Sequence, residues 1–477
     1  MFSAFRRKSD SPDEATVQVG RGNKAAATTT TTTTPFCFDQ DGYAYPNLFQ
    51  EADEMTVVAL LLYIMTDMRA LAKTDQLAHG PERILTLPTT LEATLTCIEE
   101  NVELLKAKTD HEMALEALKS IQQRFDLHQQ EAASNSTKSW FNPFGAAAKA
   151  TGTAPAQLVA FGDDQADKEL VYAIAVDPVR KRITVGFRGS VTPVDFITDA
   201  CIELHNRPNP VKGEGQDEKI GIHHGFDEYL LKRRKSEDCK YDEILRQVEA
   251  LFDENDRYKD YKLYVTGHSL GGALACLFSF ETAAAALTAG KDSKIPLPVT
   301  CVSVASPRVG NEAFQIAFGA LEKQGALRHL RVAHAQDPVT MMPKTSSARM
   351  LAMLSPVTFL AVHAKDRLFA SRDTYRHTGV KLRLLSDKKA NKDKGPWCEL
   401  SYASATTAQE ELADDEPDSK KGNSSGSLLE SIKALSFSGV PGVSFHYGPT
   451  YTERLTKVKT ELSDMTLNGV YRSMAGK

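Results

Sequence analysis

The sequence has little of what marks nucleic-acid-binding, metal-binding or disulfide-rich proteins. Its net charge is only −5 over 477 residues, so we expect neither nucleic acid nor a strongly anionic surface as a partner. The seven cysteines are scattered, odd in number and without the paired spacing of a metal site. We therefore expect reduced thiols in a reducing compartment, no metal and no cofactor.

Long hydrophobic runs are scarce as well. The first fifteen residues, MFSAFRRKSDSPDEA, contain no apolar core of the kind that a signal peptide needs. The most apolar early run, VVALLLYIM at 57–65, is too short to cross a bilayer and is followed directly by Asp67 and Arg69. It predicts a buried helix, with shallow insertion into a membrane as the alternative. These features predict an intracellular, cytoplasmic protein.

Composition changes along the chain predict its organisation. Residues 1–42 are polar, include seven consecutive threonines and predict a disordered tail, whereas 43–150 are patterned as a helical region with two or three helices. From about 157, apolar strand-like runs alternate with helical stretches: LVYAIAVD, RITVGFRGS, YKLYVTG, VTCVSVAS and HLRVAHA. This alternation predicts an α/β domain over 151–477 with a mostly parallel sheet covered on both faces. We expect a flexible insertion at 386–440 and a closing helix over 447–474, with a loop near Asn468 and Gly469.

The stretch YVTGHSLGGALACL (264–277) begins as a strand and ends as a helix. Gly267 and Gly271 lie two positions on either side of Ser269, where side chains would collide at so tight a turn. The pattern predicts the nucleophile elbow of the α/β-hydrolases, with the Ser269 hydroxyl near the start of the helix. An ordinary glycine-rich turn is the alternative.

A serine nucleophile needs a base, an acid that orients the base, and donors for the oxyanion. Asp337 directly follows the run HLRVAHAQ, where the acid of an open α/β sheet is expected, although Asp before Pro is also a common turn. Three histidines follow it, and His363 lies in an apolar segment that favours packing. Chain order alone leaves His377 and His446 open as the base.

Several segments, in this order, resemble the motifs of the class 3 lipases, the fungal-type lipase family. They are VGFRGS (185–190), DFITDA (195–200), IHHGFDEYL (222–230), GHSLGG (267–272), ASPRVGNEAF (305–314) and QDPVTMMP (336–343). The resemblance covers about 165–385 and 441–455, which leaves the first 150 residues and 386–440 outside it. It implies an α/β-hydrolase fold with a mostly parallel central sheet flanked by helices, here with an N-terminal helical extension.

The resemblance also implies roles for single residues. Ser269 becomes the nucleophile, Asp337 the acid and His446 the base, since FHYGPTY (445–451) is similar to the family's late His followed by Tyr, whereas YRHTGV (375–380) resembles a structural strand. The oxyanion hole would use Ser190 and the backbone N–H of Leu270. From the residues themselves, Arg188 is expected to be a buried ion-pair partner and His268 to be structural.

The implied activity is hydrolysis of lipid carboxylic esters, such as tri-, di- or monoacylglycerols, through an acyl-enzyme on Ser269. A phospholipase or short-chain esterase is an alternative, and a non-catalytic lipase-like scaffold is another. Lipid substrates imply transient docking at a membrane or lipid-droplet surface. Residues 191–220 would supply a lid, and the apolar stretch 350–361 would line an acyl pocket or touch the membrane.

Overall fold

The computed structural model describes twelve segments of the chain. They are 17–18, 38, 44–77, 79–133, 154–166, 169–191, 203–234, 238–254, 257–343, 374–386, 397–403 and 443–475. The proposed lid residues 192–202 and the whole apolar stretch 350–361 lie outside these segments, as does His363.

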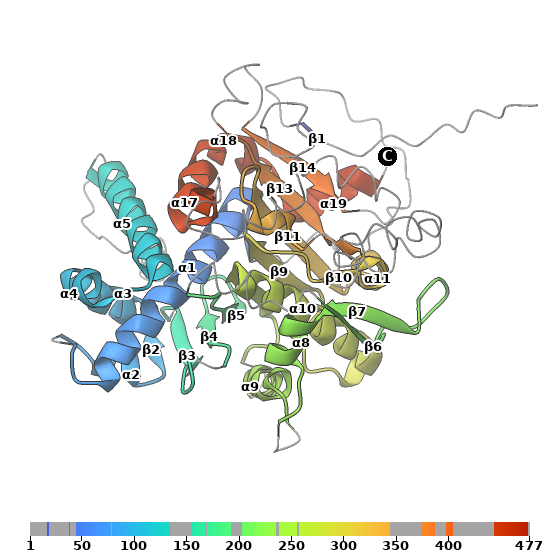
Figure 1. The fold of residues 1–477 in the computed structure, drawn as a ribbon, viewed down its shortest axis with the longest axis horizontal. Coiled ribbons are helices and arrows are strands. Elements are labelled where there is room, and N and C mark those ends of the chain that lie inside the picture. The colour runs from blue at the N-terminus through green and yellow to red at the C-terminus, as the bar shows by residue number, and fades with distance from the viewer. Residues whose placement is uncertain are drawn as a thin grey trace, which may run out of the picture.

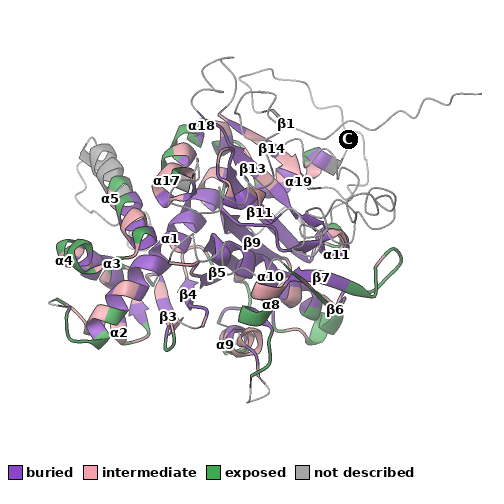
Figure 2. Ribbon diagram, viewed as in Figure 1, coloured by how far each residue is buried: buried purple, intermediate pink, exposed green. Residues whose placement is uncertain are grey.

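Within the described residues, a ten-stranded sheet forms the centre of the molecule (Figure 1). Five central strands pair in parallel: β5 (Arg182–Phe187), β8 (Lys262–His268), β9 (Val299–Val304), β11 (Leu327–His334) and β13 (Val380–Leu384). Antiparallel strands flank them, with β4 (Tyr172–Asp177), β3 (Gln157–Gly162) and β2 (Thr89–Thr90) at one edge and β14 (Cys398–Tyr402) and β1 (Val17–Gln18) at the other. The parallel centre confirms the prediction, and its Val-, Ile- and Leu-rich strands are buried because helices cover both faces (Figure 2).

The two faces of β8 show how the layers are divided. Leu263 and Val265 pack in the core shared with α8 (His224–Leu230), α9 (Lys240–Asp253), α10 (Leu270–Ala289) and α11 (Glu312–Lys323). Tyr264 and Thr266 point to the opposite face, because side chains alternate along a strand. There, the Thr266 hydroxyl donates to a carbonyl of α1 (Leu48–Lys73), and the Tyr264 hydroxyl donates to Glu51 of the same helix. The sheet is therefore sandwiched between the N-terminal helix and the helices that follow the parallel strands.

The N-terminal region packs directly on the sheet. Its described residues contain five helices instead of two or three: α1, α2 (Glu82–Leu85), α3 (Leu91–Glu100), α4 (Val102–Lys108) and α5 (Glu112–Ala133). Because α1 contacts β5, β8 and β9 and β2 extends the central sheet, the expected boundary at 150/151 does not separate two packing units. The apolar run 57–65 lies within α1, and its burial agrees with the prediction of a buried helix.

Two described helices are long and apolar enough to span a membrane by length and composition alone. They are Leu48–Lys73 and Leu270–Asp292, and their most apolar windows are 78% and 83% buried inside the protein. This burial is what the core helices of an α/β fold require.

A smaller four-stranded sheet adjoins the helices near α8. Its order is β12 (Tyr375–Arg376), β10 (Gly310–Asn311), β7 (Lys219–His223) and β6 (Leu204–Pro208). β6 and the start of β7 fall in the segment 191–220 that we expected to act as a lid. The polar arm of that segment is thus in part a paired strand, joined to β7 by the turn 209–218, whereas 192–202 lie outside the described residues.

Two expectations near the C-terminus need correction. The range 386–440, expected to be a flexible insertion, contains β14, which pairs along its whole length with β13; Cys398 and Leu400 are fully buried. The closing segment is three helices, α17 (Gly448–Lys457), α18 (Lys459–Ser463) and α19 (Leu467–Ala475). Asn468 and Gly469 lie inside α19 and not in a loop. Likewise, β1 lies within the tail 1–42 that was expected to be disordered, and only Phe38 is described beside it.

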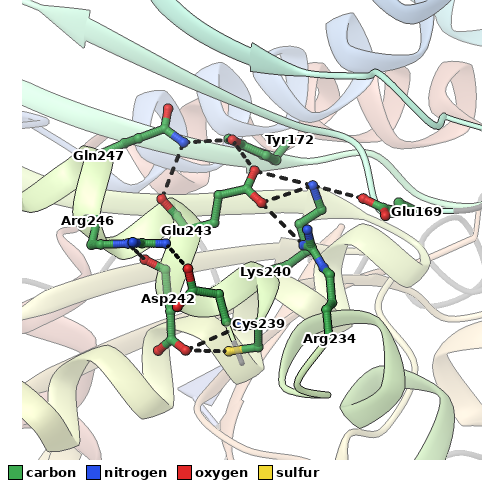
Figure 3. Close-up of polar contacts among 10 residues, drawn as sticks. Glu169, Tyr172, Arg234, Cys239, Lys240, Asp242, Glu243, Arg246 and Gln247 are labelled. Atoms are coloured by element: carbon green, nitrogen blue, oxygen red, sulfur yellow. Dashed lines mark hydrogen bonds and ion pairs between the residues drawn. The ribbon is translucent and has the colours of Figure 1, made fainter. Parts of the chain in front are cut away.

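Polar side chains fasten α9 to the sheet. The Tyr172 hydroxyl on β4 donates to Glu243 at 2.9 Å and accepts from Gln247 at 2.8 Å (Figure 3). Lys240 Nζ lies 2.9 Å from Glu169 and 3.2 Å from Glu243, so one lysine joins the helix to the segment before β4. These contacts hold α9 against β4 and the segment before it.

Candidate active site

The turn between β8 and α10 has the strained geometry that the sequence predicted. Ser269 has φ 58° and ψ −127°, a conformation that a residue with a side chain rarely adopts. A Cβ on Gly267 would lie 2.2 Å from the carbonyl oxygen of Gly271, and a Cβ on Gly271 would lie 2.1 Å from that of Phe187. Only glycine fits at both positions, so the spacing of the two glycines around Ser269 is a steric requirement of the turn.

The structure brings Ser269, His446 and Asp337 into one line of hydrogen bonds. His446 Nε2 is 2.9 Å from Ser269 Oγ, and His446 Nδ1 is 2.9 Å from Asp337 Oδ2. A carboxylate only accepts, so Nδ1 carries the proton, and the neutral imidazole leaves Nε2 free to accept the serine O–H. The three residues are at most 2% exposed. This arrangement can remove a proton from the serine hydroxyl.

Asp337 is held as a carboxylate by several donors. Its Oδ2 accepts from the Tyr451 hydroxyl at 2.7 Å, and its Oδ1 accepts from the Val339 N–H at 2.9 Å. Burial acts to raise the pKa of Asp337, but His446, Tyr451 and the Val339 N–H outweigh it and hold the pKa below its usual value. The carboxylate is therefore ionised at neutral pH and can stabilise an imidazolium on His446.

Residues near the expected oxyanion hole lie beside the elbow. Leu270 is the first residue of α10, where backbone N–H groups have no partner within the helix and the helix dipole favours negative charge. Ser190 follows β5 and Gly189, and a Cβ on Gly189 would lie 3.2 Å from Ser269 Cβ. The Gly189–Ser190 loop thus passes close to the nucleophile, while the oxyanion roles of Ser190 and Leu270 stay predictions.

His377, the other candidate base, lies elsewhere. It sits between β12 and β13, is 3% exposed, and its carbonyl accepts from Gln315 Nε2 at 2.8 Å. Burial, followed by the charges of Arg331, Arg308 and Lys381, lowers the pKa of His377 well below its ordinary value. A histidine that resists protonation is a poor general base.

Two residues expected to be structural behave differently from each other. His268 is fully buried, and its Nε2 lies 2.9 Å from the carbonyl oxygen of His446, which agrees with a supporting role. Arg188 donates to the carbonyl of Ala166 at 2.8 Å, and no carboxylate in the described part of the chain lies within ion-pair distance of it. The expected ion pair of Arg188 thus has no partner among the described residues and stays a prediction.

Sequence reasoning missed two tyrosines at this site. Tyr451 was noted only as part of a motif, although its fixed place after His446 was a usable signal for a partner of the acid. Tyr63, from α1, contacts His268 Nδ1 at 3.2 Å, and nothing in its own segment indicated a link to residues 205 positions later. Among the described residues, no group of three or more His, Cys, Asp or Glu side chains is arranged to hold a metal ion.

Comparison with known proteins finds a family match for part of the chain. Residues 184–347 match the family model described as lipase (class 3). The chain is 33% identical over 175 residues to phospholipase A1-Igamma2 of Arabidopsis thaliana, covering 34% of this chain and 31% of that protein. It is 28% identical over 222 residues to the galactolipase DONGLE of the same plant, covering 43% and 41%. The aligned part thus spans under half the length of these relatives.

Among solved structures, a lipase from Rhizopus microsporus var. chinensis is 22% identical, with 55% of this chain and 72% of that chain covered and a TM-score of 0.35. The parallel-centred sheet, the elbow after β8 and the family match agree with one another. The order of the central strands and the elbow after β8 are those of an α/β-hydrolase fold, and residues 184–347, which carry Ser269 and Asp337, match the class 3 lipase family model.

Proposed function

We propose that the protein is a serine hydrolase that cleaves carboxylic ester bonds of lipids through an acyl-enzyme on Ser269. The observation that carries the proposal is the line Ser269–His446–Asp337, with both joining distances at 2.9 Å. The strained elbow supports it, because a non-catalytic scaffold would gain nothing from holding a serine at φ 58°. The match to the class 3 lipases supports ester hydrolysis as the reaction.

The proposed reaction follows from the positions of the side chains. Ser269 Oγ attacks the ester carbonyl while His446 Nε2 takes its proton, and Asp337 stabilises the resulting imidazolium. The carbonyl oxygen becomes an oxyanion that accepts from the Leu270 N–H and from Ser190. The C–O bond then breaks, and His446 returns the proton to the departing alcohol. Water, deprotonated by His446, attacks the acyl-enzyme in the same way and releases the carboxylic acid.

The substrate is proposed to be an acyl ester of a glycerolipid. Acylglycerols fit the family, whereas phospholipids and galactolipids are favoured by the names of the curated relatives, which are phospholipases A1 and a galactolipase. We propose action inside the cell with transient docking at a membrane or lipid droplet, since lipid esters are held in such surfaces. The relatives named chloroplastic support an intracellular site.

The test is labelling and turnover of the full chain. Ser269→Ala should abolish labelling by a fluorophosphonate probe and hydrolysis of every ester in a panel of triacylglycerol, diacylglycerol, phosphatidylcholine, galactolipid and short-chain p-nitrophenyl ester. Ser279→Ala, which alters another buried serine in the same helix α10, is the control and should keep both. Undiminished labelling of folded Ser269→Ala would refute the assignment, and a wild-type protein inert towards the whole panel and the probe would refute hydrolysis itself.

A further inference from the structure

The hydroxyl of Tyr63 lies between the two loops that carry the candidate site. Its oxygen is 3.2 Å from His268 Nδ1, and the backbone N–H of Gly189 hydrogen-bonds to it. A Cβ on Gly189 would lie 2.2 Å from the same oxygen, so glycine is needed for the close approach. Gly189 directly precedes Ser190, and His268 directly precedes Ser269. One buried hydroxyl thus contacts the residue before each functional serine.

The direction of these hydrogen bonds can be worked out from the atoms. His268 Nε2 faces the His446 carbonyl oxygen at 2.9 Å, and a carbonyl only accepts, so Nε2 carries the proton. Burial and the neighbouring His446 lower the pKa of His268 to about 3, so the ring is neutral and its Nδ1 is bare. The Tyr63 hydroxyl therefore donates to Nδ1 and accepts from Gly189. Each donor and acceptor in this series, from the Gly189 N–H through the Tyr63 hydroxyl and His268 to the His446 carbonyl, then has a hydrogen-bond partner.

The opposite tautomer of His268 would be costly. With the proton on Nδ1, the bare Nε2 would face the lone pairs of the His446 carbonyl, and the Tyr63 hydroxyl would lose its acceptor. The ring of His268 also lies 4.8 Å from that of His446, centroid to centroid, so a shift of one would disturb the other. His446 is held at its backbone carbonyl by His268, while its side chain hydrogen-bonds to Ser269 and Asp337. A contact that fixes the backbone of His446 therefore also fixes the position of the imidazole base.

We propose that Tyr63 is a positioning residue for ester hydrolysis. It fixes the tautomer in which His268 holds the backbone of His446, and it anchors the loop that presents Ser190. The proposal rests on the proposed function, and it assigns part of the active site to the N-terminal helix α1, which lies outside the matched residues 184–347. The triad would then depend on a segment that the family match does not include.

The experiment compares two variants that each delete one buried hydroxyl from the interface between α1 and β8. Tyr63→Phe removes the hydroxyl that reaches His268. Tyr264→Phe removes the one that donates to Glu51 Oε1 at 3.0 Å, four positions before His268 in β8. In the full-length protein, the unfolding midpoint in urea, kcat and KM for a soluble p-nitrophenyl ester, and the second-order rate of fluorophosphonate labelling are measured for both.

We expect similar losses of stability but different kinetics. Tyr63→Phe should lower kcat and the labelling rate about ten-fold with KM unchanged, because it removes the hydrogen bonds to His268 and from Gly189 and so loosens the base and the oxyanion loop together. Tyr264→Phe should stay within about two-fold of wild type in both rates, since the single bond it loses serves only packing. Equal kinetics for the two folded variants would overturn the inference, whereas a wild-type protein without activity would overturn the proposed function instead.

A second pair keeps the inference testable if Tyr63→Phe does not fold. His268→Gln retains an N–H that can donate to the His446 carbonyl, and His268→Leu has none. We expect His268→Gln to retain most of the labelling rate and His268→Leu to lose it. Equal rates for the two His268 variants would contradict the proposal.

Discussion

Replacing Tyr451 by Phe tests how the candidate acid is held. The hydroxyl donates to Asp337 Oδ2 at 2.7 Å and accepts from the backbone N–H of His334 at 3.1 Å, and Tyr451 is fully buried. The phenyl ring can stay in place, so the substitution removes two hydrogen bonds with little change of volume. Both lost partners remain buried, because His334 is 1% exposed and Asp337 is 0% exposed.

The size of the effect follows from these two bonds. A hydrogen bond to a charged group contributes about 1.5–3 kcal/mol, and a buried N–H left without a partner costs about 1–3 kcal/mol. We therefore expect Tyr451→Phe to lower the free energy of unfolding by about 2.5–6 kcal/mol. The substitution also removes one of the donors that lower the pKa of Asp337, so this pKa should rise. Because His446 and Val339 still donate to the carboxylate, kcat should fall only about ten-fold and not by the several orders of magnitude that loss of a triad member costs.

Tyr471 provides a matched control. Its hydroxyl accepts from the backbone N–H of His329 at 2.9 Å, on the same strand β11, and donates to the buried carboxyl of Glu322. Tyr471→Phe should lower the urea midpoint and leave kcat and KM for a short-chain ester unchanged. The reasoning about Asp337 is refuted if folded Tyr451→Phe keeps wild-type turnover, or if it loses less than about 1 kcal/mol of stability.

Three further predictions concern the turn, the base and the pH dependence of stability. Gly267→Ala should prevent folding or lower the free energy of unfolding by more than about 3 kcal/mol, because its Cβ would lie 2.2 Å from a backbone oxygen. Gly319→Ala in α11 is the control: its Cβ would have its nearest contact at 3.4 Å, so it should be neutral or stabilising in the same urea titration. His446→Ala should reduce turnover by several orders of magnitude and His377→Ala far less; the reverse ranking in folded proteins would move the base to His377. Burial raises the pKa of Glu322 to about 8, against the hydroxyls that bond to it. The protonated Glu322 therefore contributes its full stability below the unfolded pKa, and this contribution is lost as the pH rises through about 8. Glu322→Gln should accordingly reduce the fall of the urea midpoint between about pH 5 and 9. An unchanged pH dependence would show that Glu322 ionises freely.

Local chemistry made the parallel centre and the elbow predictable. Each apolar strand run is bounded by polar or glycine-rich residues, and the spacing of Gly267 and Gly271 around Ser269 reflects a collision between backbone atoms that any sequence must avoid. The antiparallel edges were not predicted, because β14 lies in a polar range and two of its residues that pack inward, Cys398 and Leu400, are too few to give a pattern. The breaks between α17, α18 and α19 were missed for a similar reason, since no Pro or Gly marks them.

The candidate site was predictable in part. Ser269 and Asp337 each follow an apolar strand run, and that position was the signal. The choice between His377 and His446 depends on which of their loops reaches Ser269 in the folded protein, and neither local sequence contains this information. In the structure, His446 is the residue that lies between Ser269 and Asp337. The contact of Tyr63 with His268 was out of reach, because the pattern of α1 shows that it is buried and does not show against what. The catalytic roles themselves stay predictions until the variants are measured.

The position of α1 also has a consequence for how the chain folds while it is being synthesised. Its second half packs with α3 and α5, which are made soon afterwards, but Leu48, Ala52 and Met55 pack in a cluster with β8, β9, β11, β13 and the C-terminal helices. This first half, apolar and helical, has no cover until most of the chain has left the ribosome. During that interval it presents the kind of surface that chaperones bind and that aggregates form from. We expect yields in recombinant hosts to depend on chaperone supply, and fragments that stop before α17 to be degraded or insoluble even though they contain the whole elbow.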